Sequence, residues 1–296
     1  MRKKKSKIAL AIAGGGCKAL YGLGVGYKLR TWGIKINEIS GVSAGAASAL
    51  MILSENEEES IEYFEQLLMR NKSNFHTSNL LKGKRPFPHE SMYRRTIRHA
   101  IDFEKLKKTK VKIYISAIRA FPFKNNWEDY YNQIMLIPQT MQAVILDDKD
   151  KEKGIQGNRV RKIVQDWDLK EVIFTNKDIK HAVIAEQLVL ISSSIPPIIS
   201  FQNINGEYYL DGGLVNNLLL EYHDPKAKKI AIYYEETTLF GKKEECMQNT
   251  YFIKPQRKIP IHTFDYTNAK GAREAYEMGK EDAEKHKDKL YAFLES

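Results

Sequence analysis

The chain has few cysteines and no long hydrophobic run. Its 296 residues contain two cysteines, Cys17 and Cys246, in unrelated contexts, which argues against a disulfide framework or a cysteine-based zinc site. Asp147, Asp148 and Asp150 lack the glycine and distal glutamate of a calcium loop, so no metal or cofactor is expected. No apolar stretch approaches the roughly 18 residues of a membrane span. We therefore expect a soluble globular protein in a reducing, cytoplasmic setting.

Acidic residues are outnumbered by basic ones, 37 to 47, which gives a formal net charge of +10. This balance favours anionic partners. No basic stripe interleaved with aromatic residues and no nucleic-acid motif is present, so nucleic acid is not expected. Residues 1–7 form a basic cluster before a short apolar run that is too short for a signal peptide. We interpret this cluster as a leader that makes a peripheral contact with anionic lipid headgroups. The oligomeric state is left open.

A G-x-S-x-G pentapeptide lies between an apolar run and a helix-like run. It reads Gly41-Val42-Ser43-Ala44-Gly45. This pattern is typical of a nucleophile elbow, in which a sharp strand-to-helix turn exposes the serine hydroxyl. Ser43 is therefore the candidate nucleophile, and a plain helix N-cap serine is the alternative.

Apolar runs and helical periods alternate along the chain, which predicts an α/β protein with parallel β-α-β units. Gly22 and Gly26 share a helix face and predict close packing of that helix. No repeat or linker divides the chain, so we expect one domain over residues 1–296. The expected strands are 7–13, 34–39, 111–120, 130–137, 208–210 and 229–234. The expected helices are 17–32, 43–54, 57–70, 91–100, 179–191 and 269–294, and 147–158 is expected to be a surface loop.

Three further segments supply parts that a serine nucleophile requires. The amides of Gly14, Gly15, Gly16 and Cys17 follow the first strand at a helix start, where they can form an oxyanion hole. Asp211 comes at a strand end before Gly212 and Gly213, a turn that allows close approach to the serine. The serine-rich segment 192–197 lies upstream of it. Lys18 either orients the glycine loop or is a solvated helix lysine.

Together these segments resemble the patatin-like phospholipase family, whose motifs occur in this order. They are Gly14-Gly15-Gly16-Cys17-Lys18-Ala19, Gly41 to Gly45, Ser192 to Pro196, and Asp211-Gly212-Gly213 followed by Leu214-Val215-Asn216-Asn217. The departures are Ala19 in place of a glycine and Leu219 in place of a proline. The resemblance implies a three-layer α/β/α sandwich with a mainly parallel central sheet. It also implies a Ser43–Asp211 dyad without a catalytic histidine, and a lipid or phospholipid ester as substrate. Residues 71–170 carry no motif, and in this family such a region tends to set substrate choice.

Other interpretations compete with this one. The glycine loop also matches a dinucleotide fingerprint, with Glu38 as the acidic residue of the second strand. A Ser-Asp-His triad would use one of the histidines that follow Asp211, namely His223, His262 or His286. A catalytically silent lipid-binding protein would keep the fold without turnover.

Overall fold

A mixed sheet forms the middle of the computed structural model, which describes residues 6–122, 124, 126–155, 157–239 and 243–296. In that part of the chain it has eight strands, in the order β5-β6-β3-β2-β1-β7-β8, with β4 paired to β3. Strands β3, β2, β1, β7 and β8 run parallel, whereas β4, β5 and β6 are antiparallel to their neighbours. The strands are β1 (Ile8–Ile12), β2 (Glu38–Val42), β3 (Lys112–Pro122), β4 (Lys170–Thr175), β5 (Gln202–Ile204), β6 (Glu207–Asp211), β7 (Lys228–Ile232) and β8 (Thr250–Ile253).

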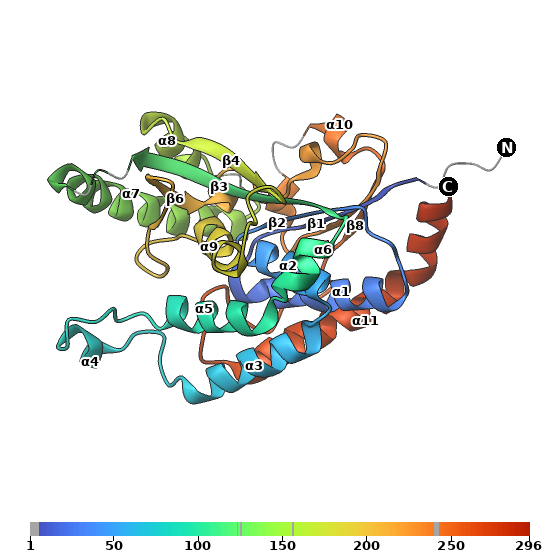
Figure 1. Cartoon of the computed structure of the whole chain (residues 1–296), viewed down its shortest axis with the longest axis horizontal. Helices are drawn as coiled ribbons and strands as arrows, with labels where there is room; N and C mark the ends of the chain where they lie inside the picture. The colour runs from blue at the N-terminus through green and yellow to red at the C-terminus, as the bar shows by residue number, and fades with distance from the viewer. Residues whose placement is uncertain (1–5, 123, 125, 156, 240–242) are drawn as a thin grey trace.

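Helices cover the sheet on both faces. Figure 1 shows α1, α2, α3, α5 and α11 on one side of it. The helices are α1 (Ala19–Thr31), α2 (Ala44–Ser54), α3 (Glu57–Arg70), α4 (Thr77–Leu80), α5 (His89–Ala100), α6 (Phe103–Lys108), α7 (Trp127–Glu152), α8 (Arg159–Asp166), α9 (Ala182–Ser192), α10 (Glu244–Met247) and α11 (Ala269–Glu295). Short 3-10 turns are η1 (Gly16–Lys18), η2 (Gly212–Leu214), η3 (Leu220–Tyr222) and η4 (Glu236–Leu239).

The alternation of side chains along β1 places the sheet between two hydrophobic layers. Leu10 and Ile12 belong to the large core beneath α1, α2 and α11. Ala11 and Ala13 belong to a second core with Leu218 on the opposite face. Because successive residues of a strand point to opposite faces, a strand buried in this way is covered on both sides. The expected three-layer α/β/α sandwich with a mainly parallel sheet is confirmed.

Helix α1 packs closely on its neighbours at its glycines. A Cβ on Gly22 would lie 2.7 Å from the Tyr234 hydroxyl oxygen, and one on Gly26 would lie 2.1 Å from Ile52 Cδ1. A Cβ on Gly24 would lie 2.0 Å from the Tyr276 carbonyl oxygen of α11. The predicted close packing of this helix is confirmed, and it brings α1 against both α2 and α11.

One predicted strand is displaced. The structure has β2 at Glu38–Val42, four residues later than the expected 34–39. Ile34 and Ile36 pack against the core from an irregular segment. The true strand contains Ser40 and Gly41 and is held by pairing with β1 on one side and β3 on the other. Its interstrand hydrogen bonds outweigh its modest apolar content.

The region from Trp127 to Glu152 was predicted wrongly. The expected strand 130–137 and the first part of the expected loop 147–158 both belong to helix α7. Along α7, Leu136, Thr140 and Ala143 are buried, whereas Tyr131 and Ile134 are exposed. Apolar residues on both faces obscure the helical period. Helices α4, α6, α8 and α10 and strands β4, β5 and β8 were not expected.

Candidate active site

Ser43 lies in a sharp turn between β2 and α2. Its backbone has φ 54° and ψ −129°, a conformation that non-glycine residues rarely adopt. The turn puts Ser43 at the start of α2, where it is half-buried and not sealed in the core. The residue therefore has both the backbone geometry and the accessibility expected of a nucleophile elbow.

Two glycines of the pentapeptide make this turn possible. A Cβ on Gly41 would lie 2.4 Å from the Gly45 carbonyl oxygen. A Cβ on Gly45 would lie 2.5 Å from the carbonyl oxygens of both Ile12 and Ala13, at the end of β1. Any larger residue would force α2 away from β1, so these contacts explain why the pentapeptide needs glycine at both positions.

The serine-rich segment after α9 links the nucleophile to the aspartate. The Ser43 backbone N–H donates to Ser192 Oγ at 2.8 Å, and Ser192 Oγ donates to the Ser116 carbonyl oxygen at 2.6 Å. The Asp211 N–H donates to the Ser194 carbonyl oxygen at 2.9 Å. One short stretch of chain thus fixes the backbones of both Ser43 and Asp211, 168 positions apart in the sequence numbering.

Asp211 is the last residue of β6, and its side chain is buried. Burial raises the pKa of its carboxyl group from 3.8 to about 7, although the Ser43 hydroxyl and the Gly213 N–H both lower it. The Gly213 N–H donates to Asp211 Oδ1 at 2.7 Å. A Cβ on Gly212 would lie 2.6 Å from the Ser116 carbonyl oxygen. The glycine turn therefore both orients the carboxylate and lets it approach β3 and Ser43.

The glycine loop after β1 has two amides without a partner among the described residues. The Gly14 N–H donates to Asn217 Oδ1 at 2.9 Å, and Asn217 Nδ2 donates back to the Gly14 carbonyl oxygen at 3.2 Å. The Cys17 N–H donates to the Thr263 carbonyl oxygen at 2.9 Å. Of the four predicted oxyanion-hole amides, those of Gly14 and Cys17 are therefore occupied. Gly15 and Gly16 are half-exposed, Gly16 lines one hollow with Ser43, and neither N–H donates to another group of the described residues.

A model of the patatin-like phospholipase family matches residues 10–223, more than half of the chain. The chain belongs to the patatin-like phospholipase family. Members of this family are lipid acyl hydrolases, so lipid ester hydrolysis is the chemistry that membership implies. The match ends just after Asn217 and η3, and so includes the glycine loop, the pentapeptide and the Asp-Gly-Gly turn.

Two solved structures match the chain with low sequence identity and low TM-scores. VipD from Legionella pneumophila is 15% identical with a TM-score of 0.44, and the alignment covers 96% of this chain and 67% of VipD. The type III effector protein ExoU is 12% identical with a TM-score of 0.37, and the alignment covers 95% of this chain and 53% of ExoU. No curated protein sequence matches the chain.

Each of the three histidines that could have completed a triad has another partner or neighbour. His223 is buried, and its Nε2 lies 2.8 Å from Ser40 Oγ, three residues before the nucleophile. His286 Nδ1 pairs with the Tyr251 hydroxyl at 2.8 Å. His262 lies near Asp265. The groups that perturb the pKa of Asp211 are Ser43 and Gly213, and no histidine is among them.

The acidic residue that the dinucleotide interpretation requires, Glu38, does not lie at the glycine loop. Glu38 is the first residue of β2, so it lies at the opposite end of the parallel strands from the glycine loop. It is buried, and a hydrogen bond with the His223 side chain lowers the pKa of its carboxyl group from 4.5 to about 2. A carboxylate in this position does not face a nucleotide bound at Gly14 to Gly16.

Lys18 forms an ion pair with Glu235, just beyond β7. Its side chain is one-quarter exposed, so it is neither fully solvated nor aimed at Ser43. Tyr234, next to Glu235, lies under the loop, because a Cβ on Gly15 would be 2.8 Å from its ring. Lys18 and Tyr234 therefore support the glycine loop from the β7 side.

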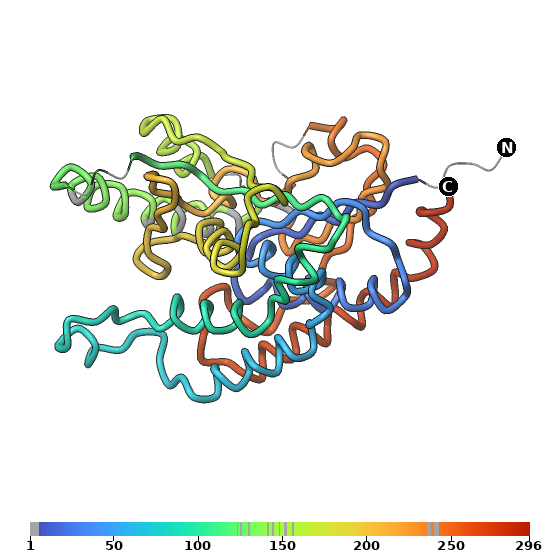
Figure 2. The backbone as a smooth tube through the Cα atoms, in the orientation of Figure 1, coloured from blue at the N-terminus to red at the C-terminus, as the bar shows by residue number. Residues whose placement is uncertain are grey.

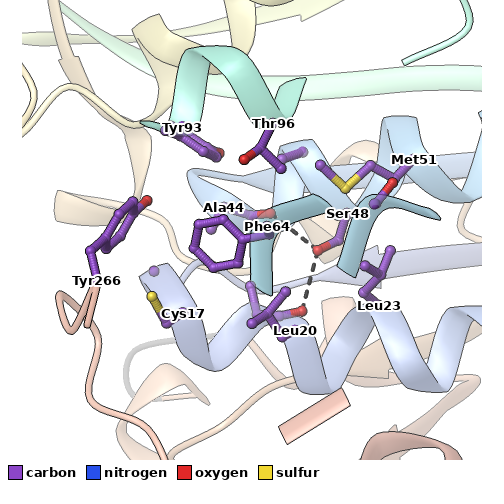
Figure 3. Close-up of a pocket in the computed structure, with 14 residues that line it drawn as sticks. Cys17, Leu20, Leu23, Ala44, Ser48, Met51, Phe64, Tyr93, Thr96 and Tyr266 are labelled. Atoms are coloured by element: carbon purple, nitrogen blue, oxygen red, sulfur yellow. Dashed lines mark hydrogen bonds between the residues drawn. The ribbon is translucent and has the colours of Figure 1, made fainter. Parts of the chain in front are cut away.

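An apolar cavity opens beside the nucleophile. Its mouth is lined by Ser43 and Gly16 together with residues of the 195–199 segment, His89 and Tyr266. Beyond the mouth, a cavity of about 50 Å³ lies between α1, α2, α3 and α5. Figure 3 shows Tyr266 and Cys17 at one end of it and Met51 and Leu23 at the other. The two spaces share Gly16, Ala44, Tyr93 and Tyr266, so the cavity leads directly away from the proposed reaction centre.

His89 is a residue of the mouth that sequence reasoning missed. It is buried, its Nε2 lies 2.9 Å from the Phe264 carbonyl oxygen, and its Nδ1 has no partner among the described residues. Since a carbonyl oxygen only accepts, Nε2 carries the proton and Nδ1 faces the surroundings as an acceptor. Burial lowers the pKa of His89. It comes at the start of α5 with no motif around it, so only the three-dimensional contacts reveal it.

Two absences hold for the described part of the chain. No group of three or more histidine, cysteine, aspartate or glutamate side chains there is arranged to hold a metal ion. No helix within the same residues has both the length and the apolar character to cross a bilayer.

Proposed function

We propose that the protein is a serine acyl hydrolase that cleaves carboxylic esters of lipids through a Ser43–Asp211 dyad. The observation that carries the proposal is the pairing of an accessible serine in an elbow turn with a buried carboxyl group whose pKa is raised to about 7. A base with a pKa near the working pH is the most effective proton acceptor, because it is both ionised and basic enough. Family membership supports the same chemistry.

The reaction proceeds through an acyl-enzyme. The Asp211 carboxylate accepts the Ser43 hydroxyl proton as Oγ attacks the ester carbonyl carbon. The amides of Gly15 and Gly16 donate to the oxygen that becomes negatively charged, and the N-terminal end of η1 and α1 adds a positive potential. Protonated Asp211 then gives its proton to the departing alcohol oxygen. Water attacks the acyl-enzyme with Asp211 again as base, which releases the carboxylic acid and restores Ser43.

The cavity behind Ser43 is suited to the acyl chain of the ester. Three of its hydroxyl groups are already occupied: Ser48 Oγ donates to the Ala19 and Ala44 carbonyl oxygens, Ser60 Oγ to that of Asn56, and Thr96 Oγ1 to that of Met92. The lining therefore presents mainly carbon to a ligand. Burial of an apolar chain there is favourable, whereas a charged headgroup would find no partner. This supports a lipase, phospholipase A or lysophospholipase.

Hydrolysis of a soluble short-chain ester and of a phospholipid tests the proposal. We expect Ser43→Ala to abolish turnover of both, and Asp211→Asn to lower kcat by about 100-fold to 10,000-fold, the usual contribution of a positioned general base. Ser91→Ala, an exposed serine of α5, and Asp288→Asn, an exposed aspartate of α11, are the matched controls and should keep full activity. Equal turnover by wild type and Ser43→Ala would refute the proposal.

A further inference from the structure

Residues 71–88, called here the docking loop, connect α3 to α5 and project from the body. Figure 2 shows it extending away from the sheet, at the same end of the molecule as α7 and opposite the C-terminus. Leu81 at its tip is 92% exposed, and Leu80 is 54% exposed. Exposed leucines at the tip of a projecting loop are costly in water and indicate a surface that meets an apolar medium.

The docking loop is positively charged. Residues 71–88 contain four lysine or arginine residues and no acidic one; they are Lys72, Lys82, Lys84 and Arg85. Of these, Arg85 forms an ion pair with Glu90. Lys82 and Lys84 directly follow the two leucines and are exposed, and neither has a carboxylate partner in the described part of the chain. Apolar side chains bordered by cations fit a lipid surface that carries anionic headgroups.

Hydrogen bonds and an aromatic contact connect the two sides of the docking loop. The His76 N–H donates to the Pro86 carbonyl oxygen at 2.8 Å. The ring centroids of Phe75 and Phe87 lie 5.2 Å apart. At the tip, the Lys84 N–H donates to the Asn79 carbonyl oxygen at 2.8 Å. These bonds hold Leu80 and Leu81 at the outer end of a defined element.

The base of the loop is fixed to the mouth of the candidate active site. Arg85 Nη2 donates to the carbonyl oxygens of Pro197 at 2.7 Å and Ile198 at 3.2 Å. On the other side, Asn71 Nδ2 donates to the Tyr266 carbonyl oxygen at 2.7 Å. Ile198 and Tyr266 both line the mouth beside Ser43. A surface held by this loop is therefore held next to the opening through which an ester reaches Ser43.

Helix α7 lies at the same end of the molecule (Figure 1) and also exposes apolar side chains, of which Trp127 is the most exposed at 77%. Tyr131 and Ile134 are 52% and 51% exposed. The lysine nearest its start, Lys124, is neutralised by Glu128, and Asp129 follows. The exposed apolar residues at the start of α7 are therefore bordered by net negative charge, whereas those of the docking loop are bordered by lysines.

We infer that the docking loop places the protein on an anionic lipid surface, with Leu80 and Leu81 inserted among the acyl chains and Lys82 and Lys84 against the headgroups. The inference rests on the proposed lipid ester substrate, whose headgroup region it brings to the mouth. It differs from a contact through the basic cluster 1–7. Residues 1–5 lie outside the described residues, and Lys7 pairs with Asp224 at 2.9 Å at the start of β1, the strand end away from Ser43.

Vesicle co-sedimentation of the full-length chain tests the inference. The Ser43→Ala variant is used throughout so that no lipid is consumed, with vesicles of phosphatidylcholine alone or mixed with phosphatidylglycerol. Binding should be stronger to the mixed vesicles and should weaken with salt. Lys82→Ala with Lys84→Ala should weaken binding to the mixed vesicles about 25-fold, because each lysine contributes about fivefold to the affinity. Leu80→Ser with Leu81→Ser should weaken binding to both vesicles by about 100-fold or more.

Two matched variants control for charge and for apolar area. Lys107→Ala with Lys108→Ala removes two exposed lysines of α6, near the start of β3 and so at the far end of the strands. Tyr131→Ser with Ile134→Ser removes two apolar side chains of α7 that are about as exposed as Leu80. Both should bind like the parent. Equal losses of vesicle binding in the control and loop variants would overturn the inference. It would also be overturned if Leu80→Ser with Leu81→Ser converts a dimer to monomers without any change in vesicle binding.

The outcome is separable from that of the proposed function. In the otherwise wild-type chain, the loop variants should hydrolyse a soluble short-chain ester at the normal rate and lose activity only on vesicles. Unchanged vesicle activity in the loop variants, with Ser43 still reactive, would refute the docking loop and leave the hydrolase intact. Vesicle binding that depends on the loop in a chain without ester turnover would refute the hydrolase alone.

Discussion

Replacing Asp211 with asparagine should make the protein more stable at alkaline pH. The carboxyl group is buried, and its pKa is about 7 in the folded protein against 3.8 for an ordinary aspartate. Above pH 7 the folded state must hold a carboxylate that is far better solvated in the unfolded chain. Asparagine keeps an oxygen that can accept from the Gly213 N–H but never carries the charge.

The size and sign of the effect follow from linkage. Because the folded-state pKa is raised, the unfolded chain releases the proton first. The protein is therefore destabilised as pH rises from about 3.8, and the loss is complete above about 7. The difference between the two pKa values corresponds to a free energy of about 4 kcal/mol. We expect Asp211→Asn to exceed wild type by about that amount at pH 8 and to match it near pH 4.

Urea unfolding followed by tryptophan fluorescence measures this difference, since the chain has three tryptophans. Asp288→Asn, which removes an exposed carboxylate from α11, should shift stability little at either pH. The reasoning is refuted if Asp211→Asn is no more stable than wild type at pH 8, or if its advantage is the same at pH 4. The same variant should be almost inactive, so that its gain in stability accompanies a loss of function.

Three further predictions concern the mechanism and the cavity. For wild type, kcat/KM should rise about tenfold per pH unit below about pH 7 and level off above it, because Asp211 must be ionised to accept a proton; a flat profile from pH 5 to 8 would contradict this. His223→Asn should lower the unfolding free energy by about 1–3 kcal/mol, because Ser40 loses a buried partner, and should leave kcat/KM of the folded enzyme nearly unchanged. A fall of 100-fold or more with the fold intact would instead favour a triad. In a series of ester substrates, kcat/KM should increase about fourfold per methylene until the cavity is filled, and Ala47→Leu should move the optimum to shorter chains. An unchanged optimum would show that the acyl chain lies elsewhere.

The parts of the site that local sequence specifies were predictable. Gly41, Ser43 and Gly45 form one turn, and the glycines are needed for contacts within it or with the adjacent strand. Asp211 and Gly213 form another turn whose hydrogen bond spans two residues. Such short-range constraints leave a pattern in the sequence that can be read without the fold.

Contacts between distant segments were not predictable. Asn217 holds Gly14 from 203 positions away, and the Thr263 carbonyl occupies the amide of Cys17. No residue near Gly14 or Cys17 in the sequence indicates these contacts. The predicted oxyanion hole therefore included the amides of Gly14 and Cys17, whose N–H groups instead bind Asn217 and Thr263. His89 reaches the mouth only because α5 packs beside the 262–266 segment.

The fold shows the same division. Helix α3 and the elbow helix α2 follow their sequence signals, and α3 matches its predicted bounds, Glu57–Arg70. The sequence of α7 partly predicts a strand, because its tyrosine and isoleucine residues favour β structure and lie on both helix faces. The end of α7 predicts a loop, because it is highly charged. There Asp147 accepts from the N–H groups of Arg159 and Val160 at the start of α8, which needs the two helices side by side.

The central claim is that Ser43 is the nucleophile, and labelling with a fluorophosphonate ester followed by mass spectrometry of the peptides tests it most directly. The account predicts one phosphonate adduct, on the peptide that contains Ser43, and none in Ser43→Ala. It also predicts that Asp211→Asn is labelled more slowly by about the same factor as its loss of turnover. Absence of an adduct in the folded wild-type protein, or equal labelling of Ser43→Ala, would contradict it.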